Sequence, residues 1–180
     1  FFKYLNYLFK NEEVIEKVIE TSSANNLDQF YTKPKIAESC VLSFLNNVHI
    51  SQDDLIIEPS AGDGSFVEHL TRVDCKKLFF DIAPKNDLVQ KVDFLKWQPA
   101  LTKGKIHVIG NPPFGKNSKD AINFFNHAAG FADTISFIMP RTFSRESMQN
   151  KLSLNFSLNH FDVLPLKSFI GADVRCSFYI

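Results

Sequence analysis

The chain has 180 residues, of which 44% are hydrophobic and 22% are charged, and its formal net charge is +0 at pH 7. This length and composition suit one folded domain and exclude an intrinsically disordered chain. The sequence has no continuous apolar stretch of about 18 residues, which excludes a membrane-spanning helix and predicts no membrane partner.

Residues 1–27 are expected to form an amphipathic helix followed by a polar linker. Apolar side chains recur at helical spacing, for example at Leu5, Leu8, Val14 and Val18, and the glutamates lie on other faces. The apolar stripe either packs on the chain's own domain or binds a protein partner, and the pattern leaves both open. Residues 28–180 are then expected to form one domain.

Short apolar runs alternate with helical patterns along that domain. Pro34 stands where a helix can begin, and further helical patterns lie at residues 65–73, 118–130 and 144–153. Runs typical of strands lie at residues 55–60, 77–83, 105–112, 134–140, 160–165 and 174–180, with a brief strand near Val92. The alternation predicts βαβ units and a mostly parallel sheet. The last two runs are separated by a segment too short for a crossover helix, so we expect them to form an antiparallel hairpin.

The cysteines give no sign of a disulfide framework or a metal site. Cys40, Cys75 and Cys176 lie far apart and share no Cys-x-x-Cys spacing. We therefore expect no metal and a reducing location, cytoplasmic or, in a eukaryote, nuclear.

Two glycines follow the first predicted strand, within EPSAGDGSF at residues 58–66. Gly62 and Gly64 permit a tight turn and a close approach of the backbone to a ligand. Phe66 and Val67 lie where a dinucleotide fingerprint would have its third glycine, which disfavours NAD. Asp81 ends the next predicted strand, where a carboxylate can accept hydrogen bonds from both ribose hydroxyls of an adenosine-containing ligand.

The sequence GNPPFG, residues 110–115, directly follows the predicted strand that contains KIHVI. Pro112 and Pro113 lack N–H donors and have restricted φ angles, so this loop is stiff. The Asn111 side chain and the Pro112 carbonyl offer two acceptors for one NH2 group. Phe114 offers a flat face on which a base could stack. The loop is therefore a candidate for holding a nucleophilic amine, with Asn111, Pro112, Pro113 and Phe114 as its catalytic residues.

These motifs resemble those of the adenine-N6 amino-methyltransferases, in the class whose cofactor motif precedes the Asn-Pro-Pro-Phe motif. The resemblance covers about residues 28–180, including DQFYTKPKIA near the start and FIMPRTF and CSFYI in the later strands. It implies a Rossmann-like class I methyltransferase fold, with a seven-stranded, mostly parallel sheet, an antiparallel last strand and helices on both faces. Combined with the strand pattern, it predicts the order 3-2-1-4-5-7-6. It also implies S-adenosylmethionine as the cofactor and DNA or RNA as the partner.

The same resemblance implies roles for residues around the cofactor's methionine and ribose. Thr32 would lie near the methionine carboxylate and Glu58 near the amino end. Asp81 would bind the ribose hydroxyls.

At the cofactor's adenine, the resemblance implies that Ile82 packs on the ring. In DFL, residues 93–95, Asp93 would bind the adenine amino group and Phe94 would lie beside it. The other residues predicted to contact the cofactor are Tyr31, Ser60, Ala61, Gly62, Gly64 and Asn111.

Substrate binding is predicted to use Phe114 and four basic residues on the rim of the catalytic loop. Lys116 and Lys119 follow GNPPFG, and Arg141 and Arg145 flank the end of the strand pattern at 134–140, the fifth strand when the brief one near Val92 is counted. Adjacent parallel strands would bring them together. Because the net charge is zero, the positive surface that phosphates require has to come from such a local cluster.

Two other functions are compatible with the sequence. A protein glutamine amide also presents an NH2 group to such a loop, although Phe114 favours nucleic acid because glutamine methyltransferases resemble one another in having Tyr there. A non-catalytic subunit of a complex could also retain the fold. Many DNA enzymes of this class have a separate target-recognition domain, but little sequence separates the Asn-Pro-Pro-Phe motif from the next strand. The resemblance therefore supports the reaction better than any sequence specificity, and it leaves open a further domain or a protein partner for target recognition.

Overall fold

The computed structural model describes residues 30–180. The amphipathic helix expected within residues 1–27, and the domain boundary at residue 28, lie outside the described residues. No helix within residues 30–180 is both long enough and apolar enough to cross a membrane.

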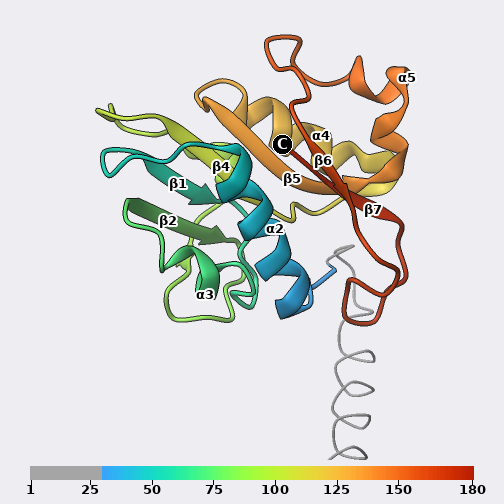
Figure 1. The fold of residues 1–180 in the computed structure, drawn as a ribbon, viewed down its shortest axis with the longest axis horizontal. Helices are drawn as coiled ribbons and strands as arrows, with labels where there is room; N and C mark the ends of the chain where they lie inside the picture. Colours follow the sequence, from blue (N-terminus) through green and yellow to red (C-terminus); the bar gives the residue numbers. More distant parts are fainter. Residues whose placement is uncertain (1–29) are drawn as a thin grey trace, which may run out of the picture.

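Seven strands form one sheet in the order β3-β2-β1-β4-β5-β7-β6, which confirms the predicted order (Figure 1). Strands β1 to β5 run parallel to one another, whereas β7 runs antiparallel to both β5 and β6. The strands are β1 (Leu55–Glu58), β2 (Lys76–Asp81), β3 (Gln90–Lys91), β4 (Ile106–Gly110), β5 (Thr134–Pro140), β6 (Phe161–Val163) and β7 (Cys176–Tyr179).

The central strands β1 and β4 are buried along their whole length, and β5 is buried except at its two ends. Their sequences are nearly continuous apolar runs because both faces of a parallel sheet are covered. Helices α2 (Pro34–Asn47) and α3 (Val67–Leu70) lie on one face of the sheet, and α4 (Lys119–Ala128) lies on the other (Figure 1).

Helix α2 begins at the proline that the sequence singled out, since the fixed φ of proline suits the first helical turn. Its buried residues follow the predicted spacing and are Ala37, Cys40, Val41 and Phe44.

Two helices are shorter than their sequence patterns predicted. α3 ends at Leu70 because the chain has to turn before β2 begins at Lys76. Within the pattern at 144–153 only α5 (Glu146–Gln149) is α-helical, and a 3-10 helix, η3 (Arg141–Ser144), precedes it. Arg145 between them has extended backbone, with φ −86° and ψ 136°, so the helical hydrogen-bond ladder is interrupted there. Two further 3-10 helices are η1 (Phe94–Lys96) and η2 (Lys116–Ser118).

This topology brings the carboxyl ends of β1, β2 and β4 to one edge of the sheet. Glu58, Asp81 and Gly110 are the last residues of these three strands. Open α/β sheets bind ligands in the crevice at that edge.

Candidate active site

The turn after β1 adopts the conformation that its glycines permit. Gly62 and Gly64 have φ angles of +52° and +92°, in the region that L side chains rarely adopt. The N–H of Gly64 donates to the Ala61 carbonyl at 2.7 Å, and the N–H of Ala61 donates to the Phe80 carbonyl at 2.8 Å. The turn is therefore fixed both internally and to β2.

The Tyr31 ring lies against this turn. A Cβ at position 62 would be 3.1 Å from Cε1 of Tyr31, so a side chain there would crowd the ring. Nζ of Lys85 lies 4.6 Å from the centre of the Tyr31 ring, in a cation–π contact. The segment before α2 thus reaches the glycine turn across the edge of the sheet.

Asp81 connects the turn after β1 with the loop after β2. It is 7% exposed, and its Oδ2 accepts a hydrogen bond from the N–H of Gly62 at 2.8 Å. Its Oδ1 accepts one from the N–H of Ala83, also at 2.8 Å. The next residue, Ile82, is 51% exposed and presents an apolar side chain beside this carboxylate.

Glu58 is a buried carboxyl at the end of β1. It is 1% exposed, and its Oε2 has no hydrogen-bond partner. Burial, with the nearby charges of Asp63 and Asp81, raises the pKa of Glu58 well above its ordinary value. A Cβ at Gly110 would lie 3.2 Å from Cγ of Glu58, so β4 can end against this carboxyl because residue 110 has no side chain.

The amide nitrogen of Asn111 is hydrogen-bonded, whereas its amide oxygen is not. Its Nδ2 donates to the Phe30 carbonyl at 2.7 Å and to Oγ1 of Thr32 at 3.1 Å. Its Oδ1 is buried without a hydrogen-bond partner. The Ser60 hydroxyl donates to the Asn111 carbonyl at 3.1 Å, which joins this loop to the turn after β1.

A groove at the carboxyl edge of the sheet brings together ten of the residues predicted for catalysis or cofactor binding. They are Tyr31, Thr32, Glu58, Ser60, Ala61, Gly62, Asp81, Asn111, Pro112 and Pro113.

Two aromatic residues of the predicted site pack on other rings. Phe94 is 1% exposed and packs on Phe124 of α4, with ring centres 5.5 Å apart, so its side chain is part of the core. Phe114 is 6% exposed and contacts Phe30 and Phe169, with ring centres 5.6 and 6.4 Å away. Its ring is therefore not an open stacking surface in this structure.

Asp93 caps the 3-10 helix η1. Its Oδ1 accepts a hydrogen bond from the N–H of Leu95 at 3.2 Å, and its Oδ2 lies 2.8 Å from Nζ of Lys96. The hydrogen bond from Lys96 lowers the pKa of Asp93. The predicted partner of Asp93, an adenine amino group, would have to share this carboxylate with Lys96.

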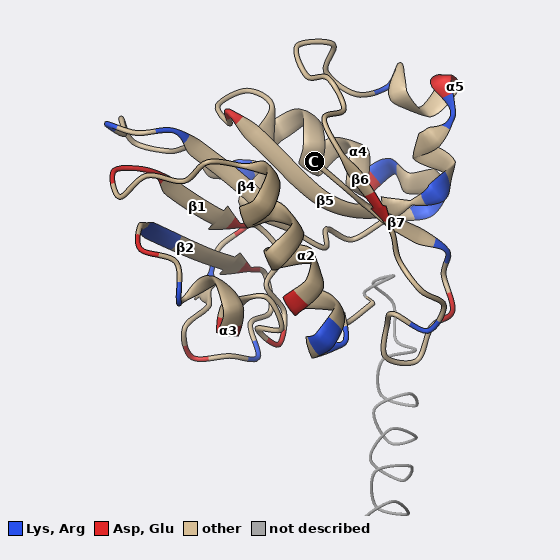
Figure 2. Ribbon diagram, in the orientation of Figure 1, with Lys and Arg blue, Asp and Glu red and all other residues tan. Residues whose placement is uncertain are grey.

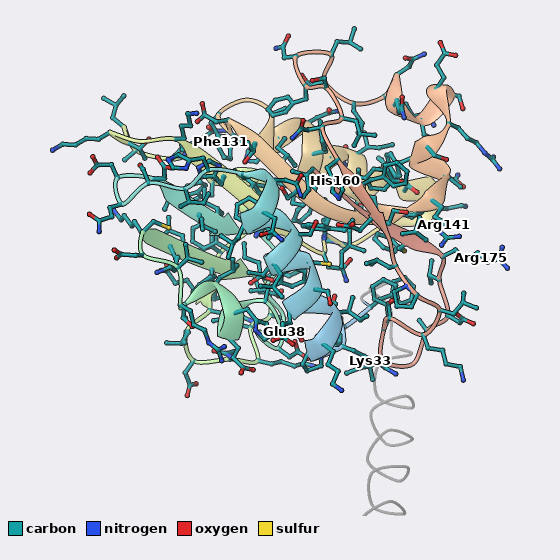
Figure 3. All side chains as sticks on the ribbon, in the orientation of Figure 1. Lys33, Glu38, Phe131, Arg141, His160 and Arg175 are labelled. Carbon is teal, nitrogen blue, oxygen red and sulfur yellow. The ribbon has the colours of Figure 1, made fainter. Side chains whose placement is uncertain are left out.

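The four predicted rim cations, Lys116, Lys119, Arg141 and Arg145, are all exposed. Sequence reasoning missed a fifth, Arg175, which precedes β7. The N–H of Arg141 donates to the Arg175 carbonyl at 3.0 Å, and Figure 3 shows these two arginines beside one another. Figure 2 shows Lys and Arg segments around β7 and α5. The predicted strand order pairs the antiparallel last strand with β5. That pairing could have predicted that Arg175, just before β7, lies beside Arg141, just after β5.

A larger cavity, of about 930 Å³, lies beside β5, lined by apolar residues of β5 and α4 and by residues 152–159. None of the predicted site residues lines it. The groove at the carboxyl edge remains the candidate site because the motifs converge there.

No family model and no curated protein matches this sequence. Solved structures do match its fold. A candidate RNA methyltransferase from Pyrococcus horikoshii has a TM-score of 0.63 and 16% identity, over 85% of each chain. A candidate class I S-adenosylmethionine-dependent methyltransferase from Listeria monocytogenes has a TM-score of 0.61 and 14% identity, over 88% of this chain.

The methyltransferase subunit of a type I restriction-modification system from Streptococcus thermophilus has a TM-score of 0.60 and 15% identity, over 91% of this chain. The present chain spans 62% of the Listeria protein and 47% of the Streptococcus subunit. With the strand order and the antiparallel β7, these likenesses show that the chain has the Rossmann-like fold of class I S-adenosylmethionine-dependent methyltransferases.

Proposed function

We propose that this chain transfers a methyl group from S-adenosylmethionine to an exocyclic amino group, with adenine N6 in DNA or RNA as the acceptor. The observation that carries the proposal is the Asn111 amide, whose oxygen is buried in the groove without a partner while its nitrogen is held by Phe30 and Thr32.

The orientation of this amide follows from its partners. The Phe30 carbonyl can only accept a hydrogen bond, so the NH2 end of Asn111 has to face it and the oxygen has to face the other way. A buried acceptor without a donor costs free energy, which a donor from a ligand would recover. An NH2 group is such a donor.

A second acceptor is available in the same loop. Among residues 30–180, no backbone N–H donates to the Pro112 carbonyl. An amine whose two hydrogens were accepted by Asn111 Oδ1 and the Pro112 carbonyl would have its lone pair directed away from both. Such positioning supplies a large part of the barrier reduction in a direct transfer. The proton released afterwards can pass to water.

The groove residues also fit the cofactor. The partnerless oxygen of Glu58 suits the methionine ammonium, and the carboxylate of Asp81 has lone pairs left for the ribose hydroxyls. The exposed side chain of Ile82 suits a flat apolar ring. When bound, the cofactor supplies a methyl group that its sulfonium already activates.

Two observations favour nucleic acid as the macromolecular partner. The four cations proposed for the rim, and Arg175, are exposed, and none of them forms an ion pair with another described residue. Two of the similar structures are named as an RNA methyltransferase and as a restriction-modification methyltransferase subunit. For adenine to stack on Phe114, the ring would have to leave its contacts with Phe30 and Phe169. We propose that a further domain or a protein partner recognises the target sequence.

Transfer of a labelled methyl group tests the proposal. The protein is incubated with labelled S-adenosylmethionine and, separately, with single-stranded DNA, duplex DNA, RNA and a protein pool. We expect label in a nucleic acid and N6-methyladenosine or its deoxy form after digestion to nucleosides. If label appears only in protein glutamine, the acceptor is the glutamine side-chain amide and not adenine. Cofactor binding without transfer to any pool would favour a non-catalytic subunit.

A further inference from the structure

Thr32 and Asn111 are 79 residues apart in sequence but are hydrogen-bonded in the structure, with Oγ1 of Thr32 accepting from Nδ2 of Asn111 at 3.1 Å. We infer that Thr32 is a positioning residue that fixes the plane of the Asn111 amide, so that Oδ1 points into the groove. This inference rests on the proposed function and assigns a determinant of its catalytic geometry. It differs from the role that the sequence resemblance implied, which placed Thr32 near the methionine carboxylate of the cofactor.

The amide needs such a partner because its own torsion does not fix it. The terminal torsion of asparagine joins an sp³ to an sp² carbon, and its energy wells are broad. One hydrogen bond, to the Phe30 carbonyl, leaves the amide free to pivot about that contact. A second acceptor, at the other N–H of the same nitrogen, removes this freedom.

Thr32 is itself held firmly enough to serve as this acceptor. It is 4% exposed and forms an antiparallel bridge with Phe169. The N–H of Lys33 donates to the Ser168 carbonyl at 3.0 Å, and the N–H of Ile170 donates to the Tyr31 carbonyl at 2.9 Å. The segment that carries Thr32 is therefore fastened to the loop between β6 and β7 on both sides of the threonine.

Substitution of Thr32 by Val tests the inference, because Val keeps the shape of Thr and removes the acceptor. We expect Thr32→Val to lower kcat at saturating cofactor by about 10-fold or more, since a displaced positioning group can cost that much. The KM for the acceptor should stay within about twofold. Thr32→Ser keeps the hydroxyl and should restore most of the kcat. Thr71→Val is the matched control, since the exposed Thr71 hydroxyl donates only to the Glu68 carbonyl.

Nuclear magnetic resonance tests the same contact without turnover. The side-chain NH2 signals of Asn111, identified by their loss in Asn111→Ala, should be protected from solvent exchange in the native protein. Thr32→Val should reduce that protection for one of the two protons, and Thr32→Ser should retain it. This readout separates the two claims: if the native protein methylates nothing but the protection behaves as expected, the proposed function fails and the positioning contact stands.

Two results would overturn the inference. One is a Thr32→Val protein with unchanged kcat and a raised KM for S-adenosylmethionine alone, which would assign the hydroxyl to the cofactor. The other is an Asn111 amide whose protection from exchange does not depend on residue 32.

Discussion

The Asp81 carboxylate and the backbone of Gly62 are joined by a hydrogen bond of 2.8 Å, across the gap between β2 and the turn after β1. The other oxygen of Asp81 accepts from Ala83 at the same distance. Each carboxylate oxygen has a further lone pair. Asp81 can therefore hold the shape of the groove and still bind the hydroxyls of a ligand.

Replacing Asp81 by Ala should weaken S-adenosylmethionine binding by more than about 10-fold, because hydrogen bonds to a charged group contribute roughly 1.5–3 kcal/mol each. Isothermal titration calorimetry measures this change. Asp87→Ala, at an exposed carboxylate in the same loop, should bind like the native protein. Equal affinities for the native and Asp81→Ala proteins would place the ribose elsewhere.

Cofactor binding should release a proton from Glu58. Burial raises the pKa of this carboxyl in the free protein, and an ammonium bound beside Oε2 would lower the pKa again, so binding would shift the carboxyl towards its ionised form. Affinity should therefore increase with pH. Calorimetry in phosphate and in Tris, whose ionisation enthalpies differ, should report proton release by the native protein and by the control Glu68→Gln, but not by Glu58→Gln. Identical heats in both buffers for the native protein would contradict this linkage.

The fold should lose stability as the pH falls below the ordinary pKa of histidine. His107 is 1% exposed, and burial lowers its pKa from the ordinary value of 6.5. The unfolded chain then binds a proton that the folded chain does not, so the free energy of unfolding decreases below about pH 6.5. Thermal unfolding at pH 5 and pH 7.5 measures the decrease. It should be smaller in His107→Gln and unchanged in His49→Gln, since His49 is exposed.

Arg141 and Arg175 should contribute to the salt dependence of nucleic-acid binding. If each contacts a phosphate, Arg141→Ala with Arg175→Ala should weaken binding and reduce the slope of log K against log salt by about 1 per lost contact. Fluorescence anisotropy with a labelled oligonucleotide measures both quantities. The control pair, Lys76→Ala with Lys103→Ala, removes exposed cations from the opposite edge of the sheet. If the slope of log K against log salt is the same in the two double variants, Arg141 and Arg175 do not contact the nucleic acid.

The sequence was most informative about strand order and about the edge where the motifs meet. Alternating runs and the short last connection predicted the sheet, because parallel strands need crossovers and a hairpin does not. Parallel strands also end at a common edge, which is why Glu58, Asp81 and Asn111, each at or just after a strand end, line one groove.

Other features depended on packing between distant segments. Hydrophobicity could not show whether an aromatic ring beside the motif faces a ligand or the core, and Phe94 and Phe114 both pack inward on partners far away in sequence. The hydrogen bond from Asn111 to Thr32 likewise could not be predicted from the local sequence, since it forms only when the segment before α2 lies across the end of β4.

The most direct test of the account is methyl transfer by Asn111→Ala compared with the native protein. Losing the acceptor for the target amine should reduce kcat by on the order of 100-fold or more, while the affinity for S-adenosylmethionine stays nearly intact. Asn47→Ala, which removes an exposed amide from the end of α2, is the control and should keep full activity. Near-normal turnover of Asn111→Ala on every acceptor that the native protein methylates would contradict the amino-methyltransferase mechanism.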